Sequence, residues 1–167
     1  MTATLYSSIW LALAAFVVGE TGKQRPIVPR WAWPASLAGA LLCVLHILIA
    51  FGHQHHWSHD AAVEATARQT AAVYGLAWGG GVYVNYVFVA VWLADLWRWR
   101  TRPAEYFARS PAVEWGLRAF FFIIIVNAAI VFASPRTRIA GVVLTVILIV
   151  SWVKRGEERK GRQGRKE

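Results

Sequence analysis

The sequence predicts an all-α integral membrane protein, a helical bundle with five transmembrane helices, and three observations lead to that prediction. Of the 167 residues, 57% are hydrophobic, whereas soluble domains are roughly 45–50% apolar. Ten tryptophans are typical of a membrane protein, because indole rings favour the headgroup level of a bilayer. Five apolar segments approach the ~20 residues that a spanning helix needs. Backbone groups in lipid must pair internally, which favours helices for all five segments.

The predicted spans cover, in chain order, about residues 4–19, 34–52, 75–97, 117–133 and 138–153. The first has no Lys or Arg before its apolar run, unlike a cleaved signal peptide, so we interpret it as a retained span. Only SPRTR separates the last two spans, which are short. Ser134 followed by Pro135 is typical of a helix start, which favours a tight hairpin over one long bent helix.

The distribution of basic residues predicts the orientation. With the N-terminus outside, the cytoplasmic segments hold three basic residues in 20–33, five in 98–118 and seven in 154–167, which is 15 of the chain's 18. Positively charged loops remain in the cytoplasm. We therefore expect five spans with an extracytoplasmic N-terminus and a cytoplasmic C-terminus, in a plasma membrane or bacterial-type inner membrane. The alternative of four spans would put the basic tail outside.

The tail, residues 154–167, is rich in charge and glycine, and this composition predicts a disordered cytoplasmic segment. The net charge of +9 raises the question of nucleic-acid binding, but juxtamembrane basic clusters more often contact anionic lipids. The expected partners are therefore the lipid bilayer and, in addition, other membrane subunits or further copies of this chain.

Four of the five histidines lie in one segment, HQHHWSHD, residues 53–60. If the second helix continued through it, His46, His53, His56, Asp60 and Glu64 would form one stripe. If Gly52 broke the helix, the segment would be a loop able to fold its imidazoles around one ion. The stripe offers His53, His56 and Asp60, with His55 and His59 on the other side of the helix. Over both arrangements, the candidate ligands for Zn, Cu or Fe on the extracytoplasmic side are His53, His55, His56, His59 and Asp60. The alternative is that these are ordinary interfacial side chains beside Trp57.

His46 lies seven residues before His53, which places it ~10 Å deeper, and an ionisable group inside the bilayer is a functional hypothesis by default. Counting inward from the outer ends of the last three spans places Asn85, Asn127 and Thr145 at a similar depth, roughly 9–11 Å. This polar layer predicts either interhelical hydrogen bonds or the floor of an outward-opening cavity. In the second case, His46, Asn85 and Asn127 would bind a cofactor.

Residues at both ends of the spans add to this prediction. Near the outer end, Tyr83 and Tyr86 flank Asn85, and the glycines at 79–81 would let a helix, a loop or a ligand approach closely.

At the inner end, Glu20 and Asp95 are expected to pair with basic neighbours, namely Lys23, Arg98 and Arg100. Cys43 is the only cysteine, which excludes an intrachain disulfide.

Several classes of enzyme lack their motifs here. HQHH and HHWSH resemble one histidine box of the membrane desaturases, but no second or third box follows. Ferritin-like Glu-x-x-His pairs and a P-loop are also missing, and no Ser or Cys is placed to form a nucleophile triad. Three functions remain, and the sequence assigns no reaction to any of them. They are transition-metal binding for delivery, sensing or redox use, a non-catalytic accessory subunit of a larger respiratory or transport complex, and a b-type haem protein with His46 as a ligand.

Overall fold

A computed structural model describes the backbone of residues 2–163 and the side chains of residues 6–154. Within this range the chain is all-helical, with five long helices and two shorter ones that connect them. The long helices are α1 (Thr2–Lys23), α2 (Ala32–His55), α4 (Gly81–Thr101), α6 (Pro111–Val126) with its continuation η1 (Asn127–Val131), and α7 (Pro135–Gln163). The connecting helices are α3 (His59–Tyr74) and α5 (Pro103–Phe107).

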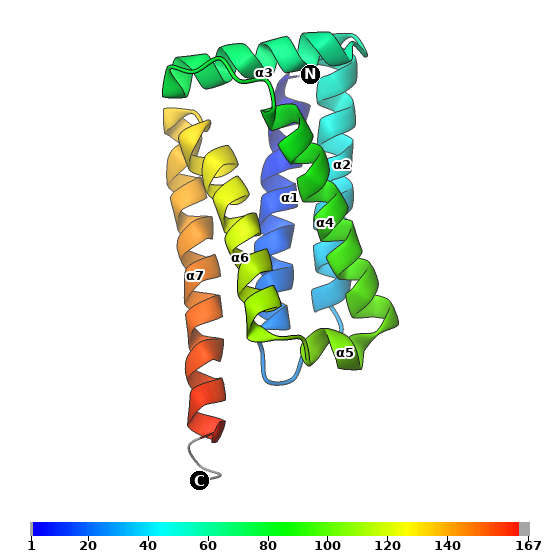
Figure 1. Cartoon of the computed structure of the whole chain (residues 1–167), viewed down its shortest axis with the longest axis vertical. Helices are drawn as coiled ribbons and strands as arrows, with labels where there is room; N and C mark the ends of the chain where they lie inside the picture. Colours follow the sequence, from blue (N-terminus) through cyan, green and yellow to red (C-terminus); the bar gives the residue numbers. More distant parts are fainter. Residues whose placement is uncertain (1, 164–167) are drawn as a thin grey trace.

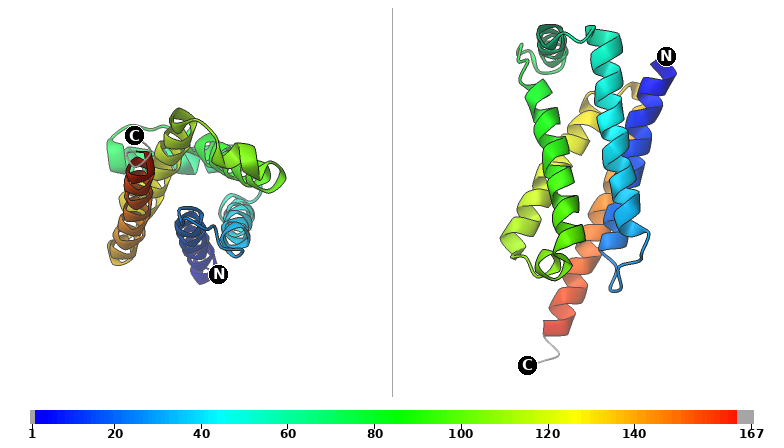
Figure 2. Two further views of the ribbon diagram at one scale, coloured as in Figure 1. Left: turned by 90° about the horizontal axis from the view of Figure 1, so that it is seen from below. Right: turned by 90° about the vertical axis from the view of Figure 1, so that its right-hand side faces the viewer.

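The long helices run side by side, and α3 lies crosswise over one end of the bundle (Figure 1). The short helix α5 lies at the opposite end, and a view from the side shows α3 end-on above the bundle (Figure 2). These two ends are called the α3 end and the α5 end below. Helix α1 begins at the α3 end, whereas α7 runs from there past the α5 end (Figure 1).

Three helical segments in the described part of the chain are long and apolar enough to cross a membrane. They are Ala32–His55, Pro111–Val131 and Pro135–Lys154. Helices α1 and α4 are of similar length, 22 and 21 residues, but do not belong to this group. Helix α4 carries Asn85, Asp95 and Arg98, which lower its hydropathy. The chain thus has the features of a membrane protein, with three helices that qualify as spans by length and composition.

The helix boundaries differ from the predicted spans where caps and turns decide them. Helix α4 begins at Gly81 instead of residue 75, because Gly75 adopts a left-handed conformation (φ 73°) that ends α3. Helix α6 begins at Pro111 instead of residue 117, since Ser110 caps it by accepting a hydrogen bond from the Val113 amide. Helix α7 begins at Pro135 after a short turn, and it continues to Gln163, within the segment predicted as a disordered tail.

Helices α1 and α2 form a close-packed hairpin because small residues face each other between them. A Cβ atom on Gly19 would lie 2.7 Å from Ser36 Cβ, and one on Gly22 would lie 2.6 Å from Ala32 Cβ. Gly39 provides the same space for the Trp92 ring, whose atoms would lie 3.0 Å from an added Cβ. Such residues let helix backbones approach closely, as they do in membrane helix pairs.

Aromatic side chains fill the centre of the bundle and join helices whose backbones lie further apart. Phe16 of α1 packs edge-on against Trp92 of α4, with ring centroids 4.9 Å apart, and lies 5.3 Å from Phe121 of α6. Phe88 contacts both Trp92 and Phe121, each at 5.6 Å. Edge-to-face and tilted pairs of this kind are favourable beyond the area they bury. This cluster separates the polar groups at the α3 end from those at the α5 end.

Candidate functional site

The histidine segment forms a tight turn between two helices. Helix α2 ends at His55, and His56 and Trp57 both adopt left-handed conformations, with φ of 49° and 62°. Ser58 then caps α3 by accepting a hydrogen bond from the Ala61 amide, 3.2 Å away. The continuous stripe from His46 to Glu64 predicted from the sequence is therefore wrong, because two left-handed residues turn the chain crosswise after His55.

Gly52 does not break the helix, so the prediction that it could do so is also wrong. It lies within α2, where a Cβ atom would meet the Trp57 ring at 3.0 Å. Phe51 also contacts Trp57, with ring centroids 6.0 Å apart. Gly52 thus leaves room for the Trp57 ring to fold back on α2, which helps to stabilise the turn.

The turn separates the predicted metal ligands. His53, His56 and Asp60 are exposed, and His59 faces α4, where its Nε2 lies 3.1 Å from Tyr83 Oη. Within the described part of the chain, no three or more His, Cys, Asp or Glu side chains are grouped so that they could hold a metal ion. The metal-binding hypothesis therefore stays a prediction, and this conformation does not assemble the predicted ligand set.

A cavity of about 510 Å³ lies beneath α3, between α2 and α4. Polar side chains on its wall come from all three helices, and they include His46 and His55 of α2, Glu64 and Gln69 of α3, and Asn85 of α4. Its volume is within the ~300–1,000 Å³ range of small-molecule sites. The structure thus brings two of the three predicted cofactor-binding residues, His46 and Asn85, to one cavity.

His46 is half-buried on the wall of this cavity. Its Nδ1 atom lies 3.2 Å from the hydroxyl of Ser8, which is buried on α1. A hydrogen bond at one ring nitrogen fixes the orientation of an imidazole. His46 is therefore held in place by α1 at the side of the cavity.

Asn85 is exposed on the wall of the same cavity, and its side chain makes no hydrogen bond with any residue that the structure describes. The depth estimate from the sequence places this residue inside the bilayer. An amide in such surroundings favours a hydrogen-bonding partner, because an unpaired polar group in an apolar medium carries a desolvation cost. Asn85 therefore has free hydrogen-bonding capacity inside the cavity.

A second cavity, of about 570 Å³, adjoins the first. Thr66, Gln69 and Asn85 line both cavities. Asn127, the third predicted cofactor-binding residue, lies on the wall of the second cavity at the start of η1. Most of the remaining wall is apolar, formed by Leu76, Trp78, Val84, Ile123, Ile124 and Phe132.

Helix α3 covers the cavities and is fastened near both of its ends. At its start, His59 Nε2 lies 3.1 Å from Tyr83 Oη, and the His59 ring stacks on Tyr86. At its last residue, Tyr74 Oη donates to Asn127 Oδ1 at 2.6 Å. In between, the glycines that precede α4 let α3 lie close, since a Cβ atom on Gly79 would lie 2.7 Å from the Val63 carbonyl oxygen.

Two other residues singled out from the sequence lie away from the cavities. Thr145 is buried in α7 and donates its hydroxyl to the Gly141 carbonyl oxygen at 2.8 Å. Cys43 is buried in α2 within the core cluster, and neither residue lines a cavity wall. The polar layer predicted from depth alone therefore includes one residue whose polar group is satisfied by its own helix.

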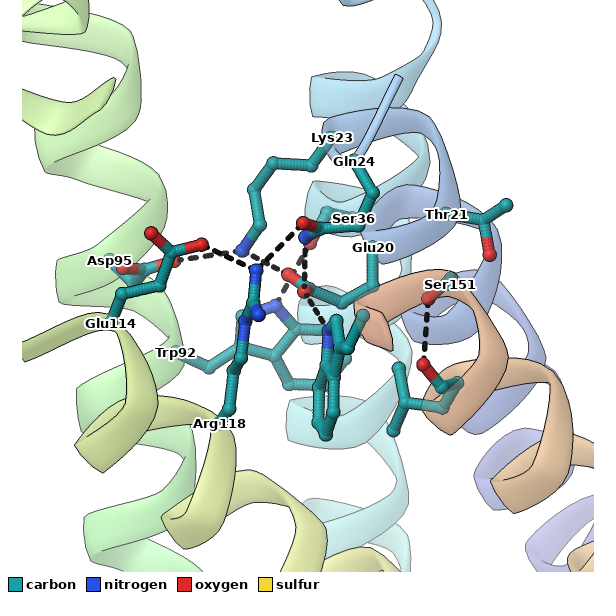
Figure 3. A network of polar contacts seen from close by, with 12 residues as sticks. Glu20, Thr21, Lys23, Gln24, Ser36, Trp92, Asp95, Glu114, Arg118 and Ser151 are labelled. Atoms are coloured by element: carbon teal, nitrogen blue, oxygen red, sulfur yellow. Dashed lines mark hydrogen bonds and ion pairs between the residues drawn. The ribbon is translucent and has the colours of Figure 1, made fainter. Parts of the chain in front are cut away.

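A second polar cluster, at the α5 end, was only partly foreseen from the sequence. It contains three carboxylates and three basic groups, so its formal charge is zero. These residues are Glu20, Asp95, Glu114, Lys23, Arg109 and Arg118. Figure 3 shows all of these residues except Arg109. Lys23 pairs with Glu20 and lies 3.8 Å from Asp95, while Arg118 pairs with Glu114 and donates to Gln24 Oε1 at 2.7 Å.

The sequence led us to expect that Asp95 pairs with neighbours such as Arg98 or Arg100. In the structure it does not pair with either of them. Its Oδ1 atom accepts from Arg109 at 2.7 Å, and its Oδ2 atom accepts from Tyr106 Oη at 2.6 Å. Burial raises the pKa of Tyr106, which keeps its hydroxyl protonated as a donor. The expected pairing of Glu20 with Lys23 is present.

The cluster at the α5 end is closed. Trp152 of α7 donates to Glu20 Oε2 at 3.0 Å, which ties the fifth long helix to the same group. Among the described side chains, every buried nitrogen and oxygen atom has a hydrogen-bond partner. A sequence signal for Glu114 and Arg118 existed, namely an acid and a base at i,i+4, but the predicted span began only at residue 117 and left Glu114 outside.

Comparisons with known proteins give no matching family model, no matching curated protein and no matching solved structure.

Proposed function

We propose that the chain is a five-span membrane protein with its N-terminus and the α3 end on the extracytoplasmic side. A helix rises 1.5 Å per residue, so the 22 residues of α1 and the 21 of α4 give lengths of roughly 32 Å, enough for a ~30 Å hydrocarbon core. The excess of basic residues in the segments at the α5 end supports this orientation. The expected location is a plasma or inner membrane.

We further propose that this protein binds a small molecule in the cavity that α3 covers. The observation that carries this proposal is the convergence of polar side chains from three helices on one cavity of about 510 Å³. His46 and Asn85 are the central residues. His46 is oriented by Ser8, and the Asn85 amide has no partner among the described residues.

A purely structural role would not explain this arrangement. Polar side chains that hold membrane helices together are expected to pair across the interface. Asn127 does so, since its Oδ1 accepts from Tyr74 of α3, while its Nδ2 donates to the Ile123 carbonyl oxygen of its own helix at 2.8 Å. Asn85 makes no such contact with a described residue and is exposed to the cavity, which favours a ligand as its partner.

Native mass spectrometry of the protein, released from detergent micelles after purification from its own membrane, tests this function. We expect the wild-type protein to carry a bound molecule and Asn85→Leu to carry clearly less of it. Val87→Leu is the matched control, because Val87 is exposed on the same helix and lines neither cavity. The proposal fails if wild type carries nothing, or if Asn85→Leu retains the molecule as well as the control does.

Metal analysis and an optical spectrum of the same samples test the remaining predictions. Stoichiometric Zn, Cu or Fe that is lost from His46→Ala and His55→Ala would support the metal hypothesis, since both imidazoles line the cavity. A haem Soret band lost from His46→Ala would support the haem hypothesis. The accessory-subunit function would gain support if the protein purified with other membrane subunits and carried no small molecule.

A further inference from the structure

The two adjoining cavities differ in the chemistry of their walls. The first combines imidazole, amide, hydroxyl and charged groups with apolar residues such as Ile47, Phe51 and Val82, so it is mixed in character. The second is lined mainly by aliphatic and aromatic side chains, among them Leu76, Trp78, Ile124 and Phe132. A ligand that occupied both would therefore have one hydrogen-bonding end and one apolar end.

The two cavities are adjacent to each other at a polar junction. Thr66 and Gln69 of α3 and Asn85 of α4 belong to both walls. The Thr66 hydroxyl is used within α3, where it donates to the Ala62 carbonyl oxygen at 2.9 Å. Gln69 and Asn85 make no side-chain hydrogen bond with a described residue, which leaves two amides free at the junction.

The charge on the walls favours an uncharged ligand. Apart from the imidazoles, the charged wall residues in the two cavities are Glu64 and Arg68. These two pair with each other, with Arg68 Nη1 2.6 Å from Glu64 Oε1, and both are exposed. An anionic or cationic headgroup would thus find no unpaired counter-charge, whereas carbonyl and hydroxyl oxygens suit amide and imidazole donors.

We propose that the cavities bind one uncharged amphiphile, with an oxygen-bearing headgroup in the first cavity and a hydrocarbon chain in the second. This inference rests on the proposed function and specifies its ligand class. Asn85 and Gln69 at the junction donate hydrogen bonds to headgroup oxygens, and His46 contributes to the same wall. The hydrocarbon chain of the ligand lies along η1 and the second half of α3, against Ile123, Ile124 and Phe132.

The position of the second cavity fits a ligand that comes from the bilayer. Ile123 and Phe132 are exposed by 59% and 43%, so the apolar wall continues onto the outer surface of the bundle. Trp78 and Leu76, in the link between α3 and α4, are also exposed. A hydrocarbon chain can therefore enter laterally without crossing water, while α3 covers the headgroup.

Photocrosslinking with two monoacylglycerol probes in phospholipid vesicles tests the proposed orientation. One probe carries a diazirine at the end of its chain, and the other carries it on the glycerol. We expect the chain probe to label η1 and the adjoining residues 123–132, and the glycerol probe to label α2 and α4 around His46 and Asn85. Both labels should be lost with excess unlabelled monoacylglycerol, whereas labelling of the exposed α7 surface should not saturate.

Two variants with matched controls report on each cavity separately. Ala128→Phe places a ring in the second cavity, and Ala94→Phe adds the same ring at an exposed position of α4 that lines neither cavity. Asn85→Leu, with Val87→Leu as control, removes the junction amide, for which we expect about two- to ten-fold weaker saturable labelling, the range of one lost hydrogen bond. Ala128→Phe should abolish labelling by the chain probe. Size-exclusion profiles and thermal midpoints confirm that each variant is folded.

The outcomes separate this inference from the proposed function. Labelling with the reverse orientation, or labelling that excess monoacylglycerol does not reduce, overturns the inference. If that result accompanies a bound polar molecule in native mass spectra of wild type that is clearly reduced in Asn85→Leu, the function stands and the ligand class is wrong. If no molecule is bound and no saturable label is found, both proposals fail.

Discussion

The two ends of the bundle use polar side chains in different ways. At the α5 end, six charged groups are paired, four of them buried and two, Asp95 and Arg109, largely buried. Tyrosine, glutamine and tryptophan side chains complete their hydrogen bonds. At the α3 end, Asn85 and Gln69 face a cavity and make no side-chain hydrogen bond with described residues. The first region ties α1, α4, α6 and α7 together. The second has hydrogen-bonding capacity left for a ligand.

The largest expected loss of stability comes from removing a carboxylate from the charged cluster at the α5 end. Asp95→Ala leaves Arg109 without its carboxylate partner and Lys23 with Glu20 but without Asp95. Removing one partner of a buried ion pair costs about 3–5 kcal/mol of stability. Thermal unfolding in detergent measures this loss. Glu105→Ala is the control, because its ion pair with Arg102 is exposed and should contribute at most about 1 kcal/mol. Equal midpoints for the two variants would contradict a stabilising role for the cluster.

A smaller loss of stability is expected from a substitution where α3 packs against the residues that precede α4. In Gly79→Ala the new methyl group would lie 2.7 Å from the Val63 carbonyl oxygen, so α3 must shift, at a cost of about 1–3 kcal/mol for overpacking. Hydrogen exchange should become faster in α3 and stay unchanged in α1 and α2. Gly116→Ala is the control, since no atom lies within 4 Å of its added Cβ atom and helix propensity favours alanine by about 1 kcal/mol. Unchanged exchange in α3 would show that Gly79 does not position it.

Removing the hydrogen bond that fastens α3 at Tyr74 should cause a still smaller loss of stability. Tyr74→Phe removes the hydroxyl that donates to Asn127, which corresponds to about 0.5–1.5 kcal/mol for one hydrogen bond. Hydrogen exchange should increase in the second half of α3, with little change in the global unfolding midpoint. Tyr6→Phe is the matched control, because Tyr6 is exposed on α1 at the same end of the bundle. Similar hydrogen-exchange rates in the two variants would mean that the Tyr74 contact does not hold α3 over the cavities.

Much of the helical layout could be predicted from the sequence, because apolar runs and caps are local signals. All five predicted segments coincide with long helices, and Pro135 starts α7 as expected. Depth counting placed His46, Asn85 and Asn127 at one level, and the structure puts them on the walls of two adjoining cavities. Thr145, placed at the same level, is instead buried in α7 and lines neither cavity. Helical rise is constant, so counting residues gives a position along a helix but does not show which side chains face a cavity.

The remaining features depend on how distant segments meet. Two left-handed residues, His56 and Trp57, turn the chain after α2, and a bulky residue such as Trp57 seldom adopts that conformation. Asp95 meets Arg109 because α5 folds back beneath the bundle, which sequence spacing does not reveal. The predicted spans also stopped short at helix ends, so the fourth span, which began at residue 117, left Glu114 outside the bundle.

Thermal unfolding of Asn85→Leu, measured beside Asp95→Ala, tests the contrast between the two ends most directly. If Asn85 serves ligand binding, its replacement by leucine removes an amide that no described residue pairs with, and the ligand-free midpoint should be unchanged or higher. A loss of stability as large as that of Asp95→Ala would show that Asn85 holds the bundle together and would contradict a binding role for the cavity.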